Sequence, residues 1–431
     1  MSILNQAQSA KDASIKLAVL PTNIKNKALL AIADSIRKSS KSIINANKKD
    51  VELAEKAKLN KVLINRLLIN KNKIDEMIEE IKDVAKLEDP VGKILSQVEL
   101  DKGLMLYQVT CPIGVIGAIF ESRPDAVTQI SALCIKSGNA AILKGGSEAI
   151  NSNKALVNII SKTAEANGIP KGAVQLIETR QEVTEMLKLD SHINLIIPRG
   201  SNAFVKYVQG HTKIPVLGHS EGICHVYVDK NADIKKAIDV CFDAKCQYPA
   251  VCNAMETMLV HKDIAKNFLP KMTKKFLDAG VELRGDENTN KITSNIKKAN
   301  EKDWADEYND LILSIKVVND LNGAINHINK YGSKHTDAIV TENKKSAQTF
   351  MDLVDSASVM WNASTRFADG FRYGKGAEVG ISTAKIHSRG PVGLEGLVIY
   401  KYKLVGKGHV VKDYTGKHAR KFKHRVIKRL V

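Results

Sequence analysis

The middle of the chain alternates short, wholly apolar segments with helical ones, and this pattern constrains the fold more than any other feature. The apolar runs are only about five residues long, and the segments between them have apolar residues at three- and four-residue spacing. A strand that is apolar along its whole length is typical of a parallel sheet with helices on both faces. We therefore predict strands over 140–143, 174–177 and 193–197, and helices over 126–136, 153–166, 182–187 and 202–208.

A second alternating unit follows, and a helical segment precedes both. With 431 residues the chain exceeds one ordinary core, so two or three domains are expected. Two apolar runs near residue 110 have no helix between them, which favours a hairpin or arm. Further predicted helices cover 28–44, 63–84, 233–246, 263–279, 321–330 and 344–354, and further strands cover 104–109, 115–120, 214–217, 224–228, 281–283, 312–318, 338–340 and 359–361.

Two predicted strands of the first unit end in residues that suit a phosphate group. Ligands of parallel sheets bind beyond the carboxyl ends of the strands, where glycine permits close backbone approach and a helix start attracts anions. Each of these two strand ends, taken alone, could also be an ordinary turn. Two of them in one sheet indicate a nucleotide-binding site. The G-x-G-x-x-G fingerprint is absent, which disfavours a standard Rossmann phosphate loop. The residues concerned are Lys144, Gly145 and Ser147 after one strand, and Arg199, Gly200 and Ser201 after another.

Cys252 is the candidate nucleophile. It lies between Pro249 and Asn253, at a predicted turn whose backbone N–H groups could face an oxyanion. A thiol attacks carbonyl carbon well only as a thiolate, so it needs such dipoles or a positive charge nearby. The alternative is a small buried residue, because free cysteine is among the most buried residue types.

Charge and cysteine content limit the other functional classes. The net charge is +18, but residues 401–431 contain eleven Lys or Arg against one acidic residue. A solvated basic end is expected there, and nucleic-acid binding is the less favoured alternative.

The six scattered cysteines form no CxxC pair, which favours free thiols in a reducing cytoplasm. No run is long enough to span a membrane, no secretory signal is evident, and the eleven histidines show no metal-ligand spacing.

Several separate motifs together resemble one family. They occur in order over roughly residues 5–415, in the segments PIGVIG (112–117), FESRP (120–124), LKGGS (143–147), PRGS (198–201), VCNAME (251–256), YGSKHTDAI (331–339), NASTR (362–366), GAEVGIST (376–383) and RGPVGLEGL (389–397). The chain resembles the gamma-glutamyl phosphate reductases, or glutamate-5-semialdehyde dehydrogenases, of the aldehyde dehydrogenase superfamily. The last dozen or so residues lie outside the resemblance.

The resemblance implies an α/β fold of the aldehyde dehydrogenase type. It has a Rossmann-type nucleotide-binding domain, an α/β catalytic domain and a β-arm for oligomerisation, so a homo-oligomer is expected. The expected boundaries are 1–99 and 124–240 for the NADP-binding domain, 241–365 for the catalytic domain, 100–123 and 383–405 for the arm, and 406–431 for a basic tail.

The resemblance also implies roles for particular residues. Cys252 matches the nucleophile, and the backbone N–H groups of Cys252 and Asn253 are candidate oxyanion donors. Ser122 stands where many relatives have an oxyanion-stabilising Asn. For NADP(H), Lys144 matches a lysine at the adenosine ribose or its 2′-phosphate, with Gly145, Ser147 and Arg199 beside it. Gly200 and Ser201 match the helix start near the pyrophosphate, and Glu307 is a weaker match to a ribose ligand. The substrate candidates are Arg123, Asn362 and Arg366.

One departure from the superfamily pattern bears on the reaction. Hydrolytic aldehyde dehydrogenases activate water with a Glu in a Leu-Gly-Gly context. The matching stretch here reads Pro215-Val216-Leu217-Gly218-His219 and has no Glu. A thioester at Cys252 would therefore resist hydrolysis. The implied reaction is NADPH-dependent reduction of L-glutamyl 5-phosphate to L-glutamate 5-semialdehyde in proline biosynthesis, supplied by a separate glutamate 5-kinase, with no metal. A CoA-acylating aldehyde dehydrogenase is the alternative, because it also needs no water-activating Glu.

Overall fold

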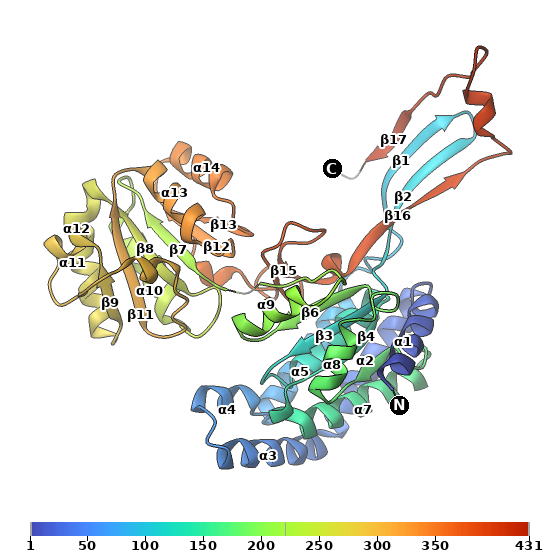
Figure 1. The fold of residues 1–431 in the computed structure, drawn as a ribbon, viewed down its shortest axis with the longest axis horizontal. Coiled ribbons are helices and arrows are strands. Elements are labelled where there is room, and N and C mark those ends of the chain that lie inside the picture. Colours follow the sequence, from blue (N-terminus) through green and yellow to red (C-terminus); the bar gives the residue numbers. More distant parts are fainter. Residues whose placement is uncertain (1, 220, 430–431) are drawn as a thin grey trace.

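The computed structural model describes residues 2–219 and 221–429. The chain forms two α/β units and one projecting arm of antiparallel strands (Figure 1). The predicted fold class is confirmed. Among the described residues, no helix combines the length and apolarity that a membrane span requires.

The first unit contains a four-stranded parallel sheet in the order β5-β4-β3-β6. Alternate residues of its strands enter different cores: Ile116 and Ala118 face one, whereas Val115 and Ile119 face the other. This two-sided burial explains why β3, and β4 and β6 up to their final basic residues, are apolar. The strands are β3 (Val115–Phe120), β4 (Ala140–Lys144), β5 (Val174–Leu176) and β6 (Leu195–Arg199).

Helices cover both faces of this first sheet. On one face lie α2 (Thr22–Lys38), α5 (Lys71–Lys86), α6 (Ala126–Lys136) and α7 (Ile150–Ala166), and on the other lie α1 (Ile3–Leu17), α8 (Arg180–Met186) and α9 (Asn202–Gly210). The sequence 3–86 also contains α3 (Ser40–Lys56) and α4 (Lys61–Leu67).

The second unit is a seven-stranded parallel sheet in the order β10-β9-β11-β8-β7-β12-β13. Its two faces are again separate cores, since Val226 and Val228 pack on one side and Tyr227 on the other. The strands are β7 (Cys224–Val228), β8 (Met255–His261), β9 (Glu282–Gly285), β10 (Lys297–Lys298), β11 (Ile312–Val318), β12 (Thr336–Val340) and β13 (Ser358–Trp361). The helices are α10 (Ile234–Cys246), α11 (Lys262–Asp278), α12 (Glu287–Ile292), α13 (Leu321–Tyr331) and α14 (Lys344–Leu353).

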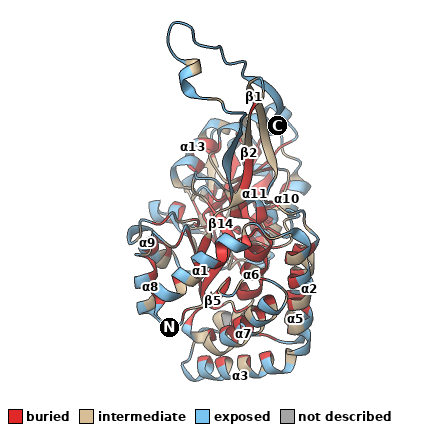
Figure 2. Ribbon diagram, turned by 90° about the vertical axis from the view of Figure 1, so that its right-hand side faces the viewer, coloured by how far each residue is buried: buried red, intermediate tan, exposed pale blue. Residues whose placement is uncertain are grey.

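The arm is a four-stranded antiparallel sheet in the order β16-β2-β1-β17. It projects from the body and is mostly exposed or half-buried (Figure 2). Its strands are β1 (Ile94–Asp101), β2 (Leu104–Pro112), β16 (Val398–Val405) and β17 (Arg425–Arg429).

Before it enters the arm, the chain returns from the second unit to the first. A short antiparallel pair, β14 (Gly380–Ser382) and β15 (Gly390–Val392), lies on this path. Val379, Val392 and Leu397 belong to the core of the first unit. The return segment therefore ties the two units together. Single turns of 3-10 helix are η1 (Ser147–Ala149), η2 (Glu301–Ala305), η3 (Thr365–Phe367), η4 (Leu394–Leu397) and η5 (Val411–Tyr414).

The arm differs from its predicted extent. Strand β3 pairs with β4 and β6 in the first sheet and is wholly buried, so placing residues 115–120 in the arm was wrong. Strand β1, predicted in the nucleotide-binding unit, belongs to the arm. Of 383–405 only β16 pairs there, because β15 and η4 pack on the first unit. The predicted basic tail is partly ordered, since β17 pairs with β1.

Other boundaries also differ. The second unit begins at β7, not at residue 241, because β7 pairs with β8 and β12. The predicted helix 28–44 covers parts of two helices, α2 and α3, which meet at Ser39. The predicted helix 63–84 likewise covers parts of α4 and α5. These two are separate because the side chain of Asn70 caps the start of α5. Residues 214–217 form no strand; they make a single bridge between Val216 and Ile196.

A fully buried ion pair joins the end of α10 to the start of β8. The ammonium nitrogen of Lys245 lies 2.5 Å from a carboxylate oxygen of Glu256, and both side chains are inaccessible to solvent. Burial raises the pKa of Glu256 to about 7 and lowers the pKa of Lys245. Each charge therefore depends on the other for compensation.

Lys245→Ala should lower the free energy of unfolding by about 3–5 kcal/mol, because Glu256 would be left buried without its partner. Lys274→Ala is the matched control, since Lys274 and Asp278 form an exposed pair on α11. It should cost no more than about 1 kcal/mol. Urea unfolding followed by circular dichroism measures both, and equal losses would contradict the assignment.

Candidate active site

The candidate site lies where the two units meet, and it uses opposite edges of their sheets. Ser122, Lys144 and Arg199 stand at the carboxyl ends of β3, β4 and β6, as the rule for parallel sheets predicts. Cys252 and His335, in contrast, precede β8 and β12, so they lie at the amino ends of second-unit strands. The nucleophile is thus presented by an edge that the sequence rule did not indicate.

Cys252 lies in a turn between α10 and β8, and close packing fixes its backbone. A side chain on Gly222 would collide with the backbone of Cys252, so only glycine permits this approach. The thiol of Cys224, at the start of β7, lies 3.2 Å from the carbonyl oxygen of Cys252 and donates to it. Cys252 itself is half-buried.

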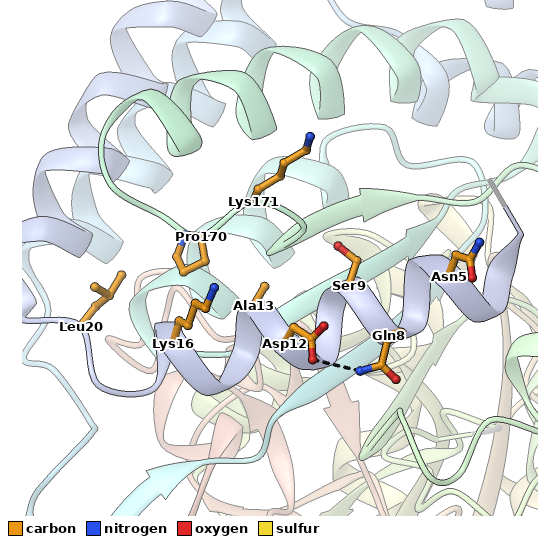
Figure 3. A pocket seen from close by; sticks show the side chains of 9 residues that line it. All are labelled: Asn5, Gln8, Ser9, Asp12, Ala13, Lys16, Leu20, Pro170 and Lys171. Carbon is orange, nitrogen blue, oxygen red and sulfur yellow. Dashed lines mark hydrogen bonds between the residues drawn. The ribbon is translucent and has the colours of Figure 1, made fainter.

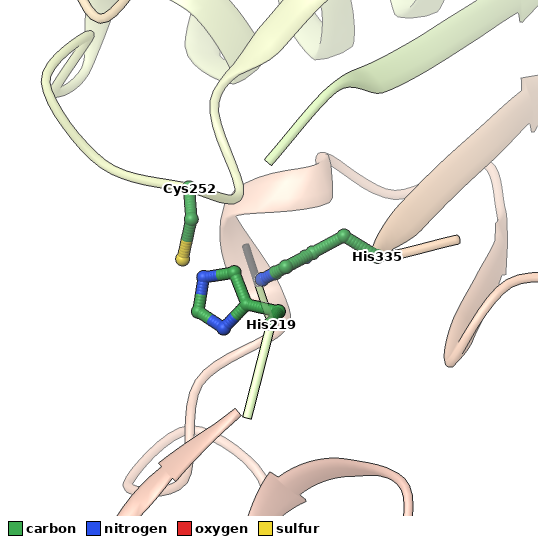
Figure 4. A group of neighbouring side chains, drawn as sticks. All are labelled: His219, Cys252 and His335. Carbon is green, nitrogen blue, oxygen red and sulfur yellow. The ribbon is translucent and has the colours of Figure 1, made fainter. Parts of the chain in front are cut away.

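Two histidines face this sulfur. The sulfur of Cys252 and the nearest ring nitrogens of His219 and His335 all lie within 4.8 Å of one another (Figure 4). The Nδ1 atom of His219 lies 3.0 Å from the carbonyl oxygen of Ile381 in β14, so Nδ1 carries the proton. The Nε2 atom of His219 is then an acceptor directed at Cys252. Burial lowers the pKa of His219, which keeps this imidazole neutral.

Two arginines surround the same region. Arg199 is half-buried beside Glu378, with a nitrogen–oxygen distance of 3.7 Å. Arg366 is only 9% exposed, and its Nε donates to Gln247 at 2.9 Å. Burial lowers the pKa of both guanidinium groups, while the nearby sulfur of Cys252 acts in the opposite direction. Both cations are therefore placed to favour a thiolate or an anionic substrate.

The loop after β4 has the features of a cofactor cradle. A side chain on Gly145 would collide with the amide of Asn153, and one on Gly146 would collide with Glu148. Asn153 is fully buried, yet neither atom of its amide has a partner within the described part of the chain. A bare backbone beside an unsatisfied amide fits a polar ligand such as a nucleotide. Lys144 is half-buried here, and burial lowers its pKa.

The start of α9 is the second anion site expected from the sequence. The backbone N–H of Ser201 donates to the carboxylate of Glu121 at 3.0 Å. A Cβ on Gly200 would lie 2.6 Å from the same carboxylate. The helix start therefore already holds an anion, supplied by the protein itself. Asn202 in α9 donates to Glu307 at 3.4 Å, so the candidate ribose ligand lies beside this helix.

Other predicted residues have structural partners. The hydroxyl of Ser122 donates to Glu148 at 2.8 Å, which engages it at the β4 loop. The side-chain nitrogen of Asn253 donates to Ala368 at 2.9 Å, so only its backbone N–H remains for an oxyanion. The amide of Asn362 bonds the backbone of Thr341 through both its atoms, which favours a turn-stabilising role over substrate binding. Arg123 is half-buried, and its charge acts on Arg199.

The histidine cluster was missed by sequence reasoning. Histidine spacing predicted no metal-ligand group, but His219, Cys252 and His335 come together from segments far apart in the chain. A partial signal was present, because His219 lies in the stretch 215–219, where the water-activating Glu of hydrolytic relatives is missing. His335 lies in one of the family-like segments, which assigned it no chemistry.

A pocket in another region has different chemistry. A pocket of about 670 Å³ is bordered by α1 and by the Pro170–Lys171 turn (Figure 3). Its lining includes Gln8 and Asp12, which are hydrogen-bonded to each other at 2.9 Å. It contains no cysteine or histidine, so it is no rival for acyl transfer.

The two-sheet body, the β-arm and the cysteine at the junction define an aldehyde dehydrogenase fold. The aldehyde dehydrogenase family model matches residues 2–311. A gamma-glutamyl phosphate reductase from Methanococcoides burtonii is 59% identical, over 98% of this chain and 96% of the relative. The crystal structure of such a reductase from Thermotoga maritima shares 43% identity with a TM-score of 0.93, covering 95% of this chain and 100% of that one.

A more distant structure shows the fold alone. An engineered glycolyl-CoA reductase with bound NADP⁺ is 15% identical with a TM-score of 0.66, covering 94% of this chain and 96% of that one. Taken with the close relatives, these matches show that the chain belongs to the gamma-glutamyl phosphate reductase family of aldehyde dehydrogenases. It is accordingly an oxidoreductase of a family that uses nicotinamide cofactors.

Glu121→Gln should tighten binding of a nicotinamide cofactor by about fivefold, because it removes a carboxylate that competes for the start of α9. Titrating intrinsic fluorescence with NADPH and NADH gives the dissociation constants. Glu185→Gln is the control, since Glu185 lies exposed on α8 and its carboxylate accepts from its helix neighbour Gln181 at 3.0 Å. Weaker binding by the Glu121 variant would show instead that the carboxylate organises the site.

Proposed function

We propose that the protein reduces L-glutamyl 5-phosphate to L-glutamate 5-semialdehyde and phosphate through a thioester on Cys252. The observation that supports this most directly is the placement of Cys252, within 4.8 Å of two imidazoles at the junction of the two units. The close relatives supply the substrate class, since they are named gamma-glutamyl phosphate reductases. The product class and the pathway, proline biosynthesis, follow from that name.

The first step is formation of the thioester. The Cys252 thiol gives its proton to Nε2 of neutral His219, whose Nδ1–H is held by the Ile381 carbonyl. The thiolate attacks the γ-carbonyl carbon, a carbon–sulfur bond forms, and phosphate leaves with the bonding electrons. The backbone N–H groups of Cys252 and Asn253 hold the oxyanion. Arg199, Arg366 and Arg123 are the cations available to the departing phosphate and the substrate carboxylate.

The second step needs a reductant, and the described residues around the β4 loop and α9 fit one. Lys144, Ser147 and the bare backbone of Gly145 would hold the adenosine end, with Gly200 and Ser201 at the pyrophosphate and Glu307 at the second ribose. NADPH, when bound, supplies the hydride that converts the thioester to the aldehyde level. Collapse of the tetrahedral adduct then expels the Cys252 thiolate, which recovers its proton from His219.

The absence of a Glu from residues 215–219 suits this chemistry. A carboxylate at that place would activate water against the thioester. The neutral imidazole of His219 donates from Nδ1 to the backbone of β14, and its Nε2 faces the sulfur. Its lone pair therefore accepts the proton of the thiol. The thioester therefore persists long enough to meet hydride in one direction or phosphate in the other.

The cellular setting is proposed on the same basis. Six free cysteines suit the reducing cytoplasm. The arm presents two exposed edge strands with exposed apolar residues such as Tyr402 and Leu404, which suits pairing with further copies of the chain. A separate glutamate 5-kinase supplies the labile acyl phosphate.

Cys252→Ser should lower kcat/KM on the order of a thousandfold or more, because a serine hydroxyl is a far weaker nucleophile at neutral pH. The assay is phosphate-dependent reduction of NADP⁺ with glutamate semialdehyde. Cys246→Ser is the control and should retain activity, since Cys246 is a half-buried helix-end thiol outside the site. Near-normal turnover by the Cys252 variant would exclude the thioester. Turnover with CoA in place of phosphate would favour the CoA-acylating alternative.

Lys144→Ala should raise KM for NADPH by about 10–100-fold, the cost of losing one charge-assisted contact, and should change KM for NADH little. Lys154→Ala is the control, because Lys154 forms an exposed pair with Glu178 at 2.7 Å. Steady-state kinetics with both cofactors measure the effect. Equal losses with NADPH and NADH would remove Lys144 from the 2′-phosphate.

A further inference from the structure

Cys252, His219 and His335 form a compact triangle of metal-ligating atoms. One thiol sulfur and two ring nitrogens lie within 4.8 Å of one another. In a tetrahedral zinc site the bond lengths place such ligand atoms about 3.3–3.6 Å apart. The three donors would need to move together by roughly 1.5 Å at most. His219 lies in the segment that joins the two units, and the other two residues lie in turns, so side-chain rotation and small loop shifts suffice.

Both histidines have the orientation of metal ligands. In His219 the Nδ1–H donates to the Ile381 carbonyl at 3.0 Å. In His335 the Nδ1 atom lies 2.8 Å from the Thr336 hydroxyl. Metal-bound histidines almost always engage their second ring nitrogen in this way, because it fixes the tautomer and the ring plane. In His219 this leaves the Nε2 lone pair toward the cluster, and in His335 a Thr336 hydroxyl that accepts from Nδ1–H would do the same (Figure 4).

His335 supplies independent evidence that a ligand belongs here. Its side chain is fully buried, and its Nε2 atom has no hydrogen-bond partner within the described part of the chain. A buried polar atom without a partner costs free energy, so such atoms call for an explanation. Figure 4 shows this nitrogen pointing at His219 and Cys252 rather than into the core. A cation at the centre of the triangle would satisfy it.

The donor set selects the class of metal. One thiolate and two imidazoles suit zinc and its neighbours among the transition metals, whereas magnesium and calcium require oxygen ligands. Three protein ligands leave a fourth tetrahedral position for water. Binding requires no oxidant or reductant: the Cys252 thiol loses its proton to solvent, and a sulfur–zinc bond forms in its place.

We propose that Cys252, His219 and His335 constitute a zinc-binding site that reversibly blocks the nucleophile. With zinc bound, the sulfur lone pair that attacks the acyl phosphate is used in the metal bond. The site then acts as an inhibitory metal switch. Its inhibitory consequence rests on the proposed function, whereas metal binding itself does not.

The test measures zinc on the full-length, chelator-treated protein without any turnover assay. Competition with a chromogenic zinc chelator should reveal one zinc ion per chain. Cys252→Ser, His219→Gln and His335→Gln should each weaken binding by at least the ~10–100-fold that loss of a supporting residue costs at known metal sites. Cys246→Ser and His418→Gln are controls outside the cluster and should bind like the unmodified chain. Absence of stoichiometric zinc, or equal binding by all five variants, would overturn the proposal.

Cobalt(II) provides a second readout, which uses the unmodified protein and therefore does not depend on the folding of any variant. The unmodified protein loaded with Co²⁺ should show the visible bands of a tetrahedral ion and a sulfur-to-cobalt charge-transfer band. Prior alkylation of Cys252 with iodoacetamide should abolish the charge-transfer band, and zinc should in turn protect Cys252 from alkylation. An octahedral spectrum without the sulfur band would also overturn the site. Zinc binding that leaves catalysis unchanged would refute only the switch.

Discussion

The buried pair of Lys245 and Glu256 is the interaction on which the candidate site depends. These two residues stand on either side of the turn that contains Cys252, one at the end of α10 and the other at the start of β8. Neither charge is accessible to water, so separating them would leave two uncompensated ions in a protein interior. The ion pair therefore restrains both ends of the turn that contains Cys252. Glu256 also accepts from the backbone of Asn309 at 3.3 Å, which extends the restraint toward Glu307.

Around this restraint, the two sheets contribute in opposite ways. The first presents the carboxyl ends of its strands, with glycine backbone, Lys144 and the start of α9, which are features for binding anions. The second presents amino ends, with turns that hold Cys252 and His335. A nucleophile and a cofactor must approach the same carbon from different sides, and two sheets facing each other supply this separation. The return segment of β14 joins them through the bond from His219 to Ile381.

In the proposed mechanism, position 219 contributes a base for the thiol rather than for water. The side chain there is a neutral imidazole, and its Nδ1–H is held by the backbone carbonyl of Ile381. It can take a proton from a thiol, but the carboxylate that activates water in hydrolytic relatives is missing. The Nε2 atoms of His219 and His335, together with the sulfur of Cys252, are the proposed ligand set for a soft cation. The proposed proton transfer and the proposed metal binding draw on the same cluster, because both use an imidazole lone pair near a thiol.

How much could be predicted from the sequence differs between the sheets and the site. Strands β4 and β6 were evident because burial on both faces makes them apolar up to their final basic residues. Strand β3 was assigned to the arm, because local pattern cannot say which sheet a strand joins; that depends on pairing with β4 and β6. Strand β17, rich in basic residues, resembled a solvated tail and acquires its order only by pairing with β1.

By itself, the sequence determined the α/β class, and it predicted two candidate anion-binding strand ends and Cys252 as the candidate nucleophile. Each of these rests on residues that are adjacent along the chain. Only the tertiary structure decided what surrounds the sulfur. His219 and His335 come from a connecting segment and a distant turn, and Asn362 is drawn into bonds with Thr341. Such neighbours arise from packing between units, and packing brings together residues whose sequence separation carries no signal.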